Sequence, residues 1–194
     1  MLADAGATAT WCPQAELAIG LGIPPTRRAR DNGMPAVFGC DAVIAASGDL
    51  FDEARTGLFA ERLLRARDRY AEYRPTERAS ELGLTAREAL EAITINAAKA
   101  IWLGDKVGSL TPGKRADIIL LRAKDPNLAP LNDVVETVVA AAHSGNVDTV
   151  LIDGEVVKRN GKLLGYDAPA VADDLVGTAE RMFATAGHAG RVPA

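Results

Sequence analysis

Asp41 is the residue whose setting points most directly to chemistry, because it interrupts an otherwise apolar run, VFGCDAV, at residues 37–43. A carboxylate in such a run loses hydration, so it needs an ion pair, several hydrogen bonds or a bound metal. The acid also follows a predicted strand of a βα unit, which is where parallel α/β barrels hold catalytic groups. The alternative is that Asp41 merely caps the segment that starts at Ala42. The spacing leaves both interpretations open.

Other candidate ligands are few, since the sequence has only two histidines, His143 and His188. Neither has a second ligand at the spacing of a metal site. His143 follows a predicted helix, where an imidazole can simply bond carbonyl groups and complement the helix dipole. Residues 108–115, GSLTPGKR, nearly match a phosphate-binding loop, but Arg115 replaces the required hydroxyl residue and a strand follows. We therefore expect no nucleotide site there and assign Asp117 to hold this turn.

The composition is that of a soluble globular protein, with 48% apolar and 25% charged residues and a net charge of -4. This balance gives no electrostatic footprint for nucleic acid. No apolar run approaches the ~18 residues of a membrane span, and the N-terminus lacks the basic start and apolar core of a signal peptide. We expect a cytoplasmic protein with no nucleic-acid and no membrane partner. Cys12 and Cys40 are too few for a disulfide framework and are expected to be free thiols.

Two βα units are expected to position Asp41. Residues 7–12 and 34–40 have the pattern of short strands, and a Pro- and Gly-rich loop and a polar helical segment separate them. Gly33 would end that helix in the left-handed conformation, so the second strand begins almost at once. Such short connections are typical of α/β folds.

Two helices are predicted next. Apolar residues recur at near-helical spacing from Asp49 to about Tyr73, with Asp49 as the N-cap of a long amphipathic helix. A capping box of Thr85 and Glu88 opens a second helix, which we expect to continue to Gly104.

The sequence then becomes β-rich in ADIILLRA and VDTVLIDGEVVKRNGKLL. The second stretch contains two hairpin-turn signals, Asp153-Gly154 and Asn160-Gly161. A helical stretch at residues 131–142 lies between the two, and an amphipathic helix in ADDLVGTAERMFATAG precedes the C-terminus. The expected fold class is therefore α/β.

Four stretches together resemble the C-terminal half of the metal-dependent amidohydrolase superfamily, in the branch of triazine chlorohydrolases, cytosine deaminases and S-adenosylhomocysteine deaminases. They are WCPQAELAIGLGIPP, the strand from Gly33 to Asp41, ITINAAKAIWLGDKVGSLTPGKRADIILL and VDTVLIDGEVVKRNGKLL. The resemblance implies the C-terminal part of a TIM-like (β/α)8 barrel plus part of a small β-sandwich. The chain would then divide into residues 1–104 with the last two βα units and following helices, residues 105–167 with the sandwich segment and its intervening helix, and residues 168–194 with a C-terminal helix and tail.

The resemblance also implies roles for particular residues. Asp41 matches the aspartate at the end of barrel strand eight, which in the family touches the catalytic metal and accepts the proton of the attacking water. The implied cofactor is a divalent metal, zinc or iron, and the implied reaction is hydrolysis of a C–N or C–halogen bond in a small heterocyclic substrate. Trp11 stands where many relatives have a histidine, and Glu16 where many have an asparagine. Both are therefore candidate substrate-binding residues of a pocket that differs from those of the best-known members.

The sequence also departs from the family pattern. The His-x-His pair, a further histidine ligand and the other acid–base residue of the family match nothing in this sequence, because they would precede it. About two of eight barrel strands are expected, so the site should be incomplete within this chain. We expect a homo-oligomer, or a partner chain that carries the N-terminal half. The alternative function is a non-catalytic truncated product or a self-associating fragment.

Overall fold

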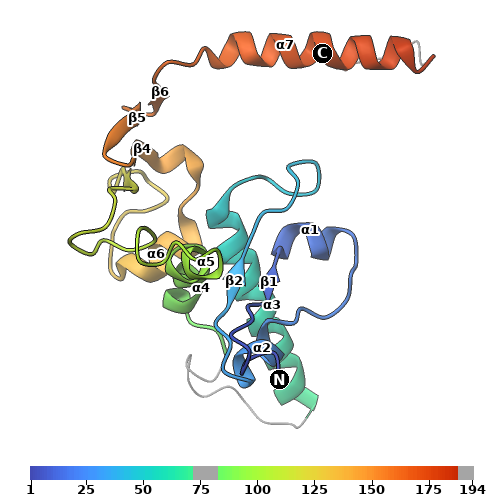
Figure 1. The fold of residues 1–194 in the computed structure, drawn as a ribbon, viewed down its shortest axis with the longest axis vertical. Helices are drawn as coiled ribbons and strands as arrows, with labels where there is room; N and C mark the ends of the chain where they lie inside the picture. The colour runs from blue at the N-terminus through green and yellow to red at the C-terminus, as the bar shows by residue number, and fades with distance from the viewer. Residues whose placement is uncertain (72–82, 188–194) are drawn as a thin grey trace.

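The structure, a computed structural model, describes residues 1–71 and 83–187 and contains two sheets flanked by helices (Figure 1). The elements of the first half are β1 (Thr10–Trp11), α1 (Pro13–Ala18), α2 (Thr26–Asp31), β2 (Val37–Phe38), α3 (Leu50–Ala71), α4 (Ala86–Ala92) and α5 (Ile95–Ala100). Those of the second half are β3 (Ile118–Leu121), α6 (Val134–Ala141), the 3-10 helix η2 (Ser144–Asn146), β4 (Val147–Ile152), β5 (Glu155–Arg159), β6 (Lys162–Leu163) and α7 (Ala168–Thr185).

The two predicted N-terminal strands form a parallel pair, β1 and β2, in which Trp11 lies opposite Phe38. Each strand is two residues long, which is shorter than predicted. The backbone N–H of Gly39 donates to the Trp11 carbonyl at 2.9 Å, so the pairing continues just past β2. Gly33 has a φ of 81°, as expected of a residue that ends a helix in the left-handed conformation. The α/β fold class is thereby confirmed, whereas the assignment of these strands to part of a (β/α)8 barrel stays a prediction.

Helix α3 packs against this strand pair and positions the segment that follows β2. Asp49 is its N-cap, as predicted, because its Oδ1 accepts the Phe51 N–H at 2.9 Å. Gly57 lets the helix approach the sheet closely, since a Cβ there would lie 2.6 Å from the Phe38 ring. The core around the helix consists of Trp11, Ala36, Phe38, Ala54, Leu58, Leu84, Ala86, Ala89, Ala92 and Val139. Val139 belongs to α6, so this core joins residues from both sides of the boundary predicted near residue 104, and the domain division stays a prediction.

The capping box of Thr85 and Glu88 is confirmed, but the prediction of one helix from there to Gly104 is wrong. The chain breaks into α4 and α5 at Ile93 and Thr94. The Thr94 hydroxyl donates to the Leu90 carbonyl at 2.7 Å, and Thr94 has non-helical angles, φ of -126° and ψ of -99°. Successive β-branched residues lose side-chain freedom in a helix, and a threonine hydroxyl that bonds back to a carbonyl favours a bend.

The β-rich region folds into one antiparallel sheet with the strand order β3-β4-β5-β6. Both predicted turns are present, and Asp153, Gly154, Asn160 and Gly161 all have positive φ, as type I′ turns require. Asp117 holds a different turn from the one predicted, since its Oδ1 accepts the Asp153 N–H at 2.7 Å. The second layer of a β-sandwich stays a prediction.

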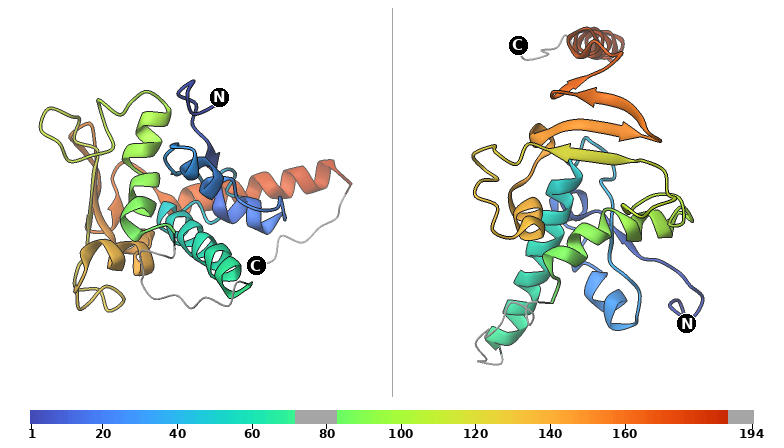
Figure 2. Two further views of the ribbon diagram at one scale, coloured as in Figure 1. Left: turned by 90° about the horizontal axis from the view of Figure 1, so that it is seen from below. Right: turned by 90° about the vertical axis from the view of Figure 1, so that its left-hand side faces the viewer.

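Helix α7 starts at Ala168, with Asp167 as its N-cap, and no residue in it is buried. Figure 1 and the right-hand view of Figure 2 show it set apart from the rest of the molecule, beyond the edge strand β6. Its apolar side chains are exposed, among them Leu175 at 65% and Met182 at 68%. Within residues 1–71 and 83–187, no helix is long and apolar enough to cross a membrane.

Candidate active site at the carboxyl ends of β1 and β2

Asp41 lies three residues beyond the end of β2, where the chain turns away from the sheet. Its φ is 56°, a left-handed conformation that is uncommon outside glycine, asparagine and aspartate. The residue is exposed, and no group among the described residues donates a hydrogen bond to its carboxylate. The carboxylate is therefore free to accept a proton or a hydrogen bond from a ligand.

The alternative role for Asp41, as the cap of the segment that starts at Ala42, finds no support in this geometry. A capping carboxylate accepts a backbone N–H two or three residues further on. The turn after Asp41 is instead closed by the Ala45 N–H, which donates to the Ala42 carbonyl at 2.9 Å. No helix begins there, because α3 starts only at Leu50.

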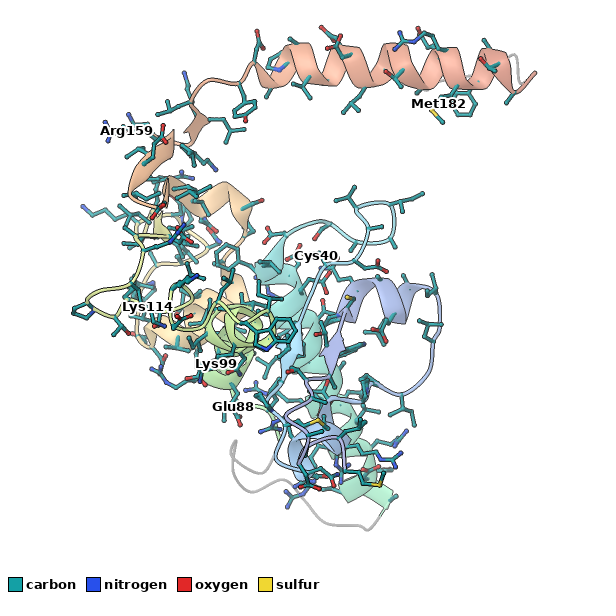
Figure 3. All side chains as sticks on the ribbon, viewed as in Figure 1. Cys40, Glu88, Lys99, Lys114, Arg159 and Met182 are labelled. Atoms are coloured by element: carbon teal, nitrogen blue, oxygen red, sulfur yellow. The ribbon has the colours of Figure 1, made fainter. Side chains whose placement is uncertain are left out.

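Cys12 and Cys40 follow β1 and β2 and lie next to Asp41; Figure 3 labels Cys40 at the end of β2. Both are free thiols, as predicted. Burial raises the pKa of the Cys12 thiol, and the nearby Asp41 and Glu16 carboxylates raise it further. Burial and the Glu53 carboxylate likewise raise the pKa of the Cys40 thiol. Both thiols are therefore protonated at neutral pH, which makes them poor nucleophiles.

The two candidate substrate-binding residues lie on either side of Cys12. Glu16 is half-buried in α1, and its Oε1 accepts the Cys12 N–H at 3.1 Å, which satisfies an amide at the helix start. The Trp11 side chain is only 1% exposed, and its ring meets the Phe38 ring edge to face at a centroid distance of 5.7 Å. A role for either residue in substrate binding stays a prediction.

Glu53 is a buried acid beneath this site that the sequence analysis did not single out. It belongs to α3, is 0% exposed, and accepts the Gln14 N–H on Oε2 at 3.0 Å. Its Oε1 is buried without a hydrogen-bond partner. Burial raises the pKa of the Glu53 carboxyl, and the bond from Gln14 partly opposes this effect. The sequence contains a signal for the burial of Glu53, because this residue shares a helix face with the buried residues Gly57 and Glu61 at intervals of four.

The described residues do not by themselves form a metal site. No group of three or more histidine, cysteine, aspartate or glutamate side chains in residues 1–71 and 83–187 is arranged to hold an ion. His143 does not bond carbonyls as predicted, since its Nδ1 accepts the Gly145 N–H at 3.0 Å and caps η2. His188 lies outside the described residues. Asp41 therefore supplies one carboxylate, whereas a stable site needs three or more protein ligands.

A cavity of about 630 Å³ lies away from Asp41, between β2, α5 and β3. Its walls are mainly apolar and include Val37, Ile101 and Ile118, but none of Asp41, Glu16 and Glu53. The cavity is therefore distinct from the candidate site at the carboxyl ends of the strands.

Residues 1–157 match the model of the amidohydrolase family. The chain belongs to the amidohydrolase family. One curated relative is a 5-methylthioadenosine/S-adenosylhomocysteine deaminase of Pyrococcus furiosus, which is 34% identical over 89% of this chain and 38% of its own length. Another is a 5'-deoxyadenosine deaminase of Methanosarcina acetivorans, which is 31% identical over 90% of this chain and 37% of its own length.

Solved amidohydrolase structures share the fold. A zinc-bound adenosine deaminase from Xanthomonas campestris superposes with a TM-score of 0.79 at 23% identity, over 92% of this chain and 38% of that one. A zinc complex of the atrazine chlorohydrolase from Arthrobacter aurescens superposes with a TM-score of 0.76 at 23% identity, over 90% of this chain and 36% of that one. This amidohydrolase chain therefore spans about two fifths of the length of the relatives that it matches.

Proposed function

We propose that this chain contributes the Asp41 end of a hydrolytic site that cleaves a C–N bond of a small heterocyclic substrate. The observation that carries the proposal is the exposed, unpaired carboxylate of Asp41 at the carboxyl end of a parallel strand, in a member of the amidohydrolase family. Binding and catalytic groups of α/β folds gather at this end of the strands.

Asp41 would act as a general base. A carboxylate within hydrogen-bond reach of a water molecule can accept its proton as the oxygen attacks carbon, and can then deliver that proton to the departing nitrogen. The neighbouring carboxylates of Glu16 and Glu53 each accept a backbone N–H, whereas the exposed Asp41 carboxylate accepts none among the described residues, which favours Asp41 for this role.

The proposal includes a divalent metal, zinc or iron, although the described residues do not contain enough ligands to hold it. The relatives include structures that are named as zinc-bound. Because Asp41 cannot hold such an ion alone, the remaining ligands would have to come from other polypeptide, either in the same protein or in a partner chain.

An amino-substituted purine nucleoside is the substrate class that the curated relatives favour, since they are named as deaminases of adenosine derivatives. A halogenated heterocycle is the second possibility, by analogy with the chlorohydrolase. The unusual Trp11 and Glu16 are the residues through which specificity would differ from that of these proteins.

A non-catalytic, self-associating chain is the second candidate function. It is favoured by the exposed apolar face of α7 and by the two short strands β1 and β2, which have no further neighbours among the described residues. Unpaired strand edges and apolar faces promote contact with another chain.

A chimera tests the catalytic proposal directly. This chain would replace the matching 38% of the Pyrococcus furiosus relative, and ammonia release from 5-methylthioadenosine would be measured in the zinc-loaded protein. We expect turnover in the chimera and a loss of about 100-fold or more in its Asp41→Asn variant, because an amide cannot accept the proton. Circular dichroism and zinc content provide the controls. If the chimera and its Asp41→Asn variant are both folded, contain zinc and turn over equally fast, Asp41 is not the base.

A further inference from the structure

The segment between Asp41 and α3 is held to the rest of the molecule at its two ends, where the Asp41 backbone interacts with the Cys12 thiol and Ser47 bonds to Gln14. Residues 42–46 make an internal bond from the Ala45 N–H to the Ala42 carbonyl, and Val43 and Ile44 are 80% and 94% exposed. Ser47 is the first residue after Asp41 for which the structure gives a hydrogen bond to another segment. The position of the Asp41 loop, defined here as residues 41–48, therefore depends on Cys12 at its start and on how Ser47 is anchored near its end.

Gln14 provides that anchor. Its side-chain Oε1 accepts the Ser47 N–H at 3.0 Å, across 33 positions of the sequence. The Ser47 hydroxyl donates to Asp52 Oδ2 and accepts the Asp49 N–H, each at 3.2 Å, which joins the loop to the start of α3. The loop is thus attached on one side to its own following helix and on the other to α1.

The Gln14 backbone is itself held by a residue of the protein core. It is the second residue of α1, where a backbone N–H has no partner within the helix, and it donates that N–H to the buried Glu53 carboxylate at 3.0 Å. A side chain mounted on a backbone that is held in this way presents its carbonyl oxygen in a defined place. Two hydrogen bonds thus connect Glu53 in the core, through Gln14, to Ser47 at the surface.

We propose that Gln14 is a positioning residue that links the segment after β1 to the Asp41 loop and, together with the contact of Cys12 with the Asp41 backbone, sets where the Asp41 carboxylate lies. The inference rests on the proposed function for the role of Asp41. It extends that proposal, because the residue that would position the base comes from the neighbouring strand unit and carries no ionisable group. Glu16 lies two residues further on in α1, so movement of α1 would carry a candidate substrate-binding residue together with the base.

Amide hydrogen exchange of the intact chain tests the link without any need for turnover. Gln14→Leu removes the acceptor while keeping a side chain of similar size. We expect exchange at Ser47 to become about fivefold faster, the effect of losing one hydrogen bond of ordinary net strength. The Asp41 amide should also shift in the nitrogen–proton correlation spectrum, whereas exchange in the middle of α3 should not change.

Two further variants make the test specific. Gln14→Glu keeps an oxygen acceptor of the same reach and should restore slow exchange at Ser47. Leu17→Ala, a change at an exposed position of the same helix, should leave both Ser47 and Asp41 as they are in the unsubstituted chain.

The proposal is wrong if Gln14→Leu leaves Ser47 exchange unchanged, or if Ser47 responds but the Asp41 signal does not move. It is equally wrong if exchange in α3 accelerates by the same factor as at Ser47, because Gln14 would then support the fold in general. A failure of the chimera to release ammonia would instead concern the role of Asp41 and would leave this link intact.

Discussion

The Glu53 carboxylate accepts the Gln14 backbone N–H through Oε2, while its Oε1 is buried without a partner. One oxygen therefore stabilises the start of α1 and the other is desolvated without compensation. Because burial raises the pKa of this carboxyl in the folded chain, folding favours its protonated form.

Glu53→Gln should reduce the pH dependence of stability. For an acid whose folded pKa lies above the unfolded value near 4.5, the stabilising effect is fully present below that value and is lost as the pH rises through the folded pKa. Urea unfolding at pH 4 and pH 7 should show a smaller loss of unfolding free energy in the variant than in the unsubstituted chain. Asp167→Asn, at the exposed N-cap of α7, serves as the control. An equal loss of unfolding free energy in Glu53→Gln and in the unsubstituted chain would show that Glu53 titrates as an ordinary surface acid.

Gly57→Ala should destabilise the chain, although the same change in an exposed helix usually adds about 1 kcal/mol of stability. The new methyl group would lie 2.6 Å from the Phe38 ring, so helix and sheet must separate. Gly177→Ala in α7 is the matched control, because the nearest atom to its new methyl group would be the end of the Arg181 side chain at 3.4 Å. We expect Gly57→Ala to lower the temperature at which the core unfolds, whereas Gly177→Ala should leave that transition unchanged and raise the helicity of α7. A rise in the core transition temperature in Gly57→Ala would mean that α3 does not pack closely on β2.

The purified chain should bind less than one zinc ion, since Asp41 is the one ligand that the candidate site offers among the described residues. Metal analysis after dialysis against zinc measures this directly. Asp41→Ala should leave the zinc content unchanged within error. About one tightly held ion per chain that disappears in the variant would reveal a ligand set that the described residues do not show.

The chain should self-associate in solution. Our sequence-based expectation places Thr8, Thr10 or Trp11 in an interface larger than the ~1,000 Å² of a specific contact. Because the Trp11 side chain is buried against Phe38, contact through this strand would use its backbone edge. Light scattering at tens of micromolar tests the prediction. A monodisperse monomer with protected amides at residues 7–12 would contradict it.

Local rules predicted much of the fold. Asp49, Gly33 and the Thr85–Glu88 box mark helix ends through side-chain oxygens or left-handed glycine, and each acts over only a few residues. The two hairpin turns were predictable for the same reason. Features that depend on the folded context were missed, notably the break at Thr94, where a side-chain bond competes with an otherwise strong helical pattern.

The residues of the candidate site could likewise be predicted only in part from the sequence. Asp41 was recognised because it stands out in an apolar run, and its position after a parallel strand is as expected. Glu53 was overlooked, since an acid in an amphipathic helix is usually assigned to the solvent side. The contact between Gln14 and Ser47 could not be predicted, because nothing in either segment specifies a bond across 33 positions.

Helix α7 has a consequence for how the chain responds to heat. Most helical stability in proteins comes from tertiary packing, and the helicity of an unpacked helix falls as the temperature rises. Helix α7 has 18 residues with none buried. Its hydrogen bonds are therefore not coupled to the core around Trp11 and Leu58. In the monomeric chain, helical ellipticity should decline gradually from low temperature as α7 frays, and a sharp transition should follow when the core unfolds. The chain would then have no single melting temperature, and a two-state analysis of its ellipticity would underestimate the unfolding enthalpy.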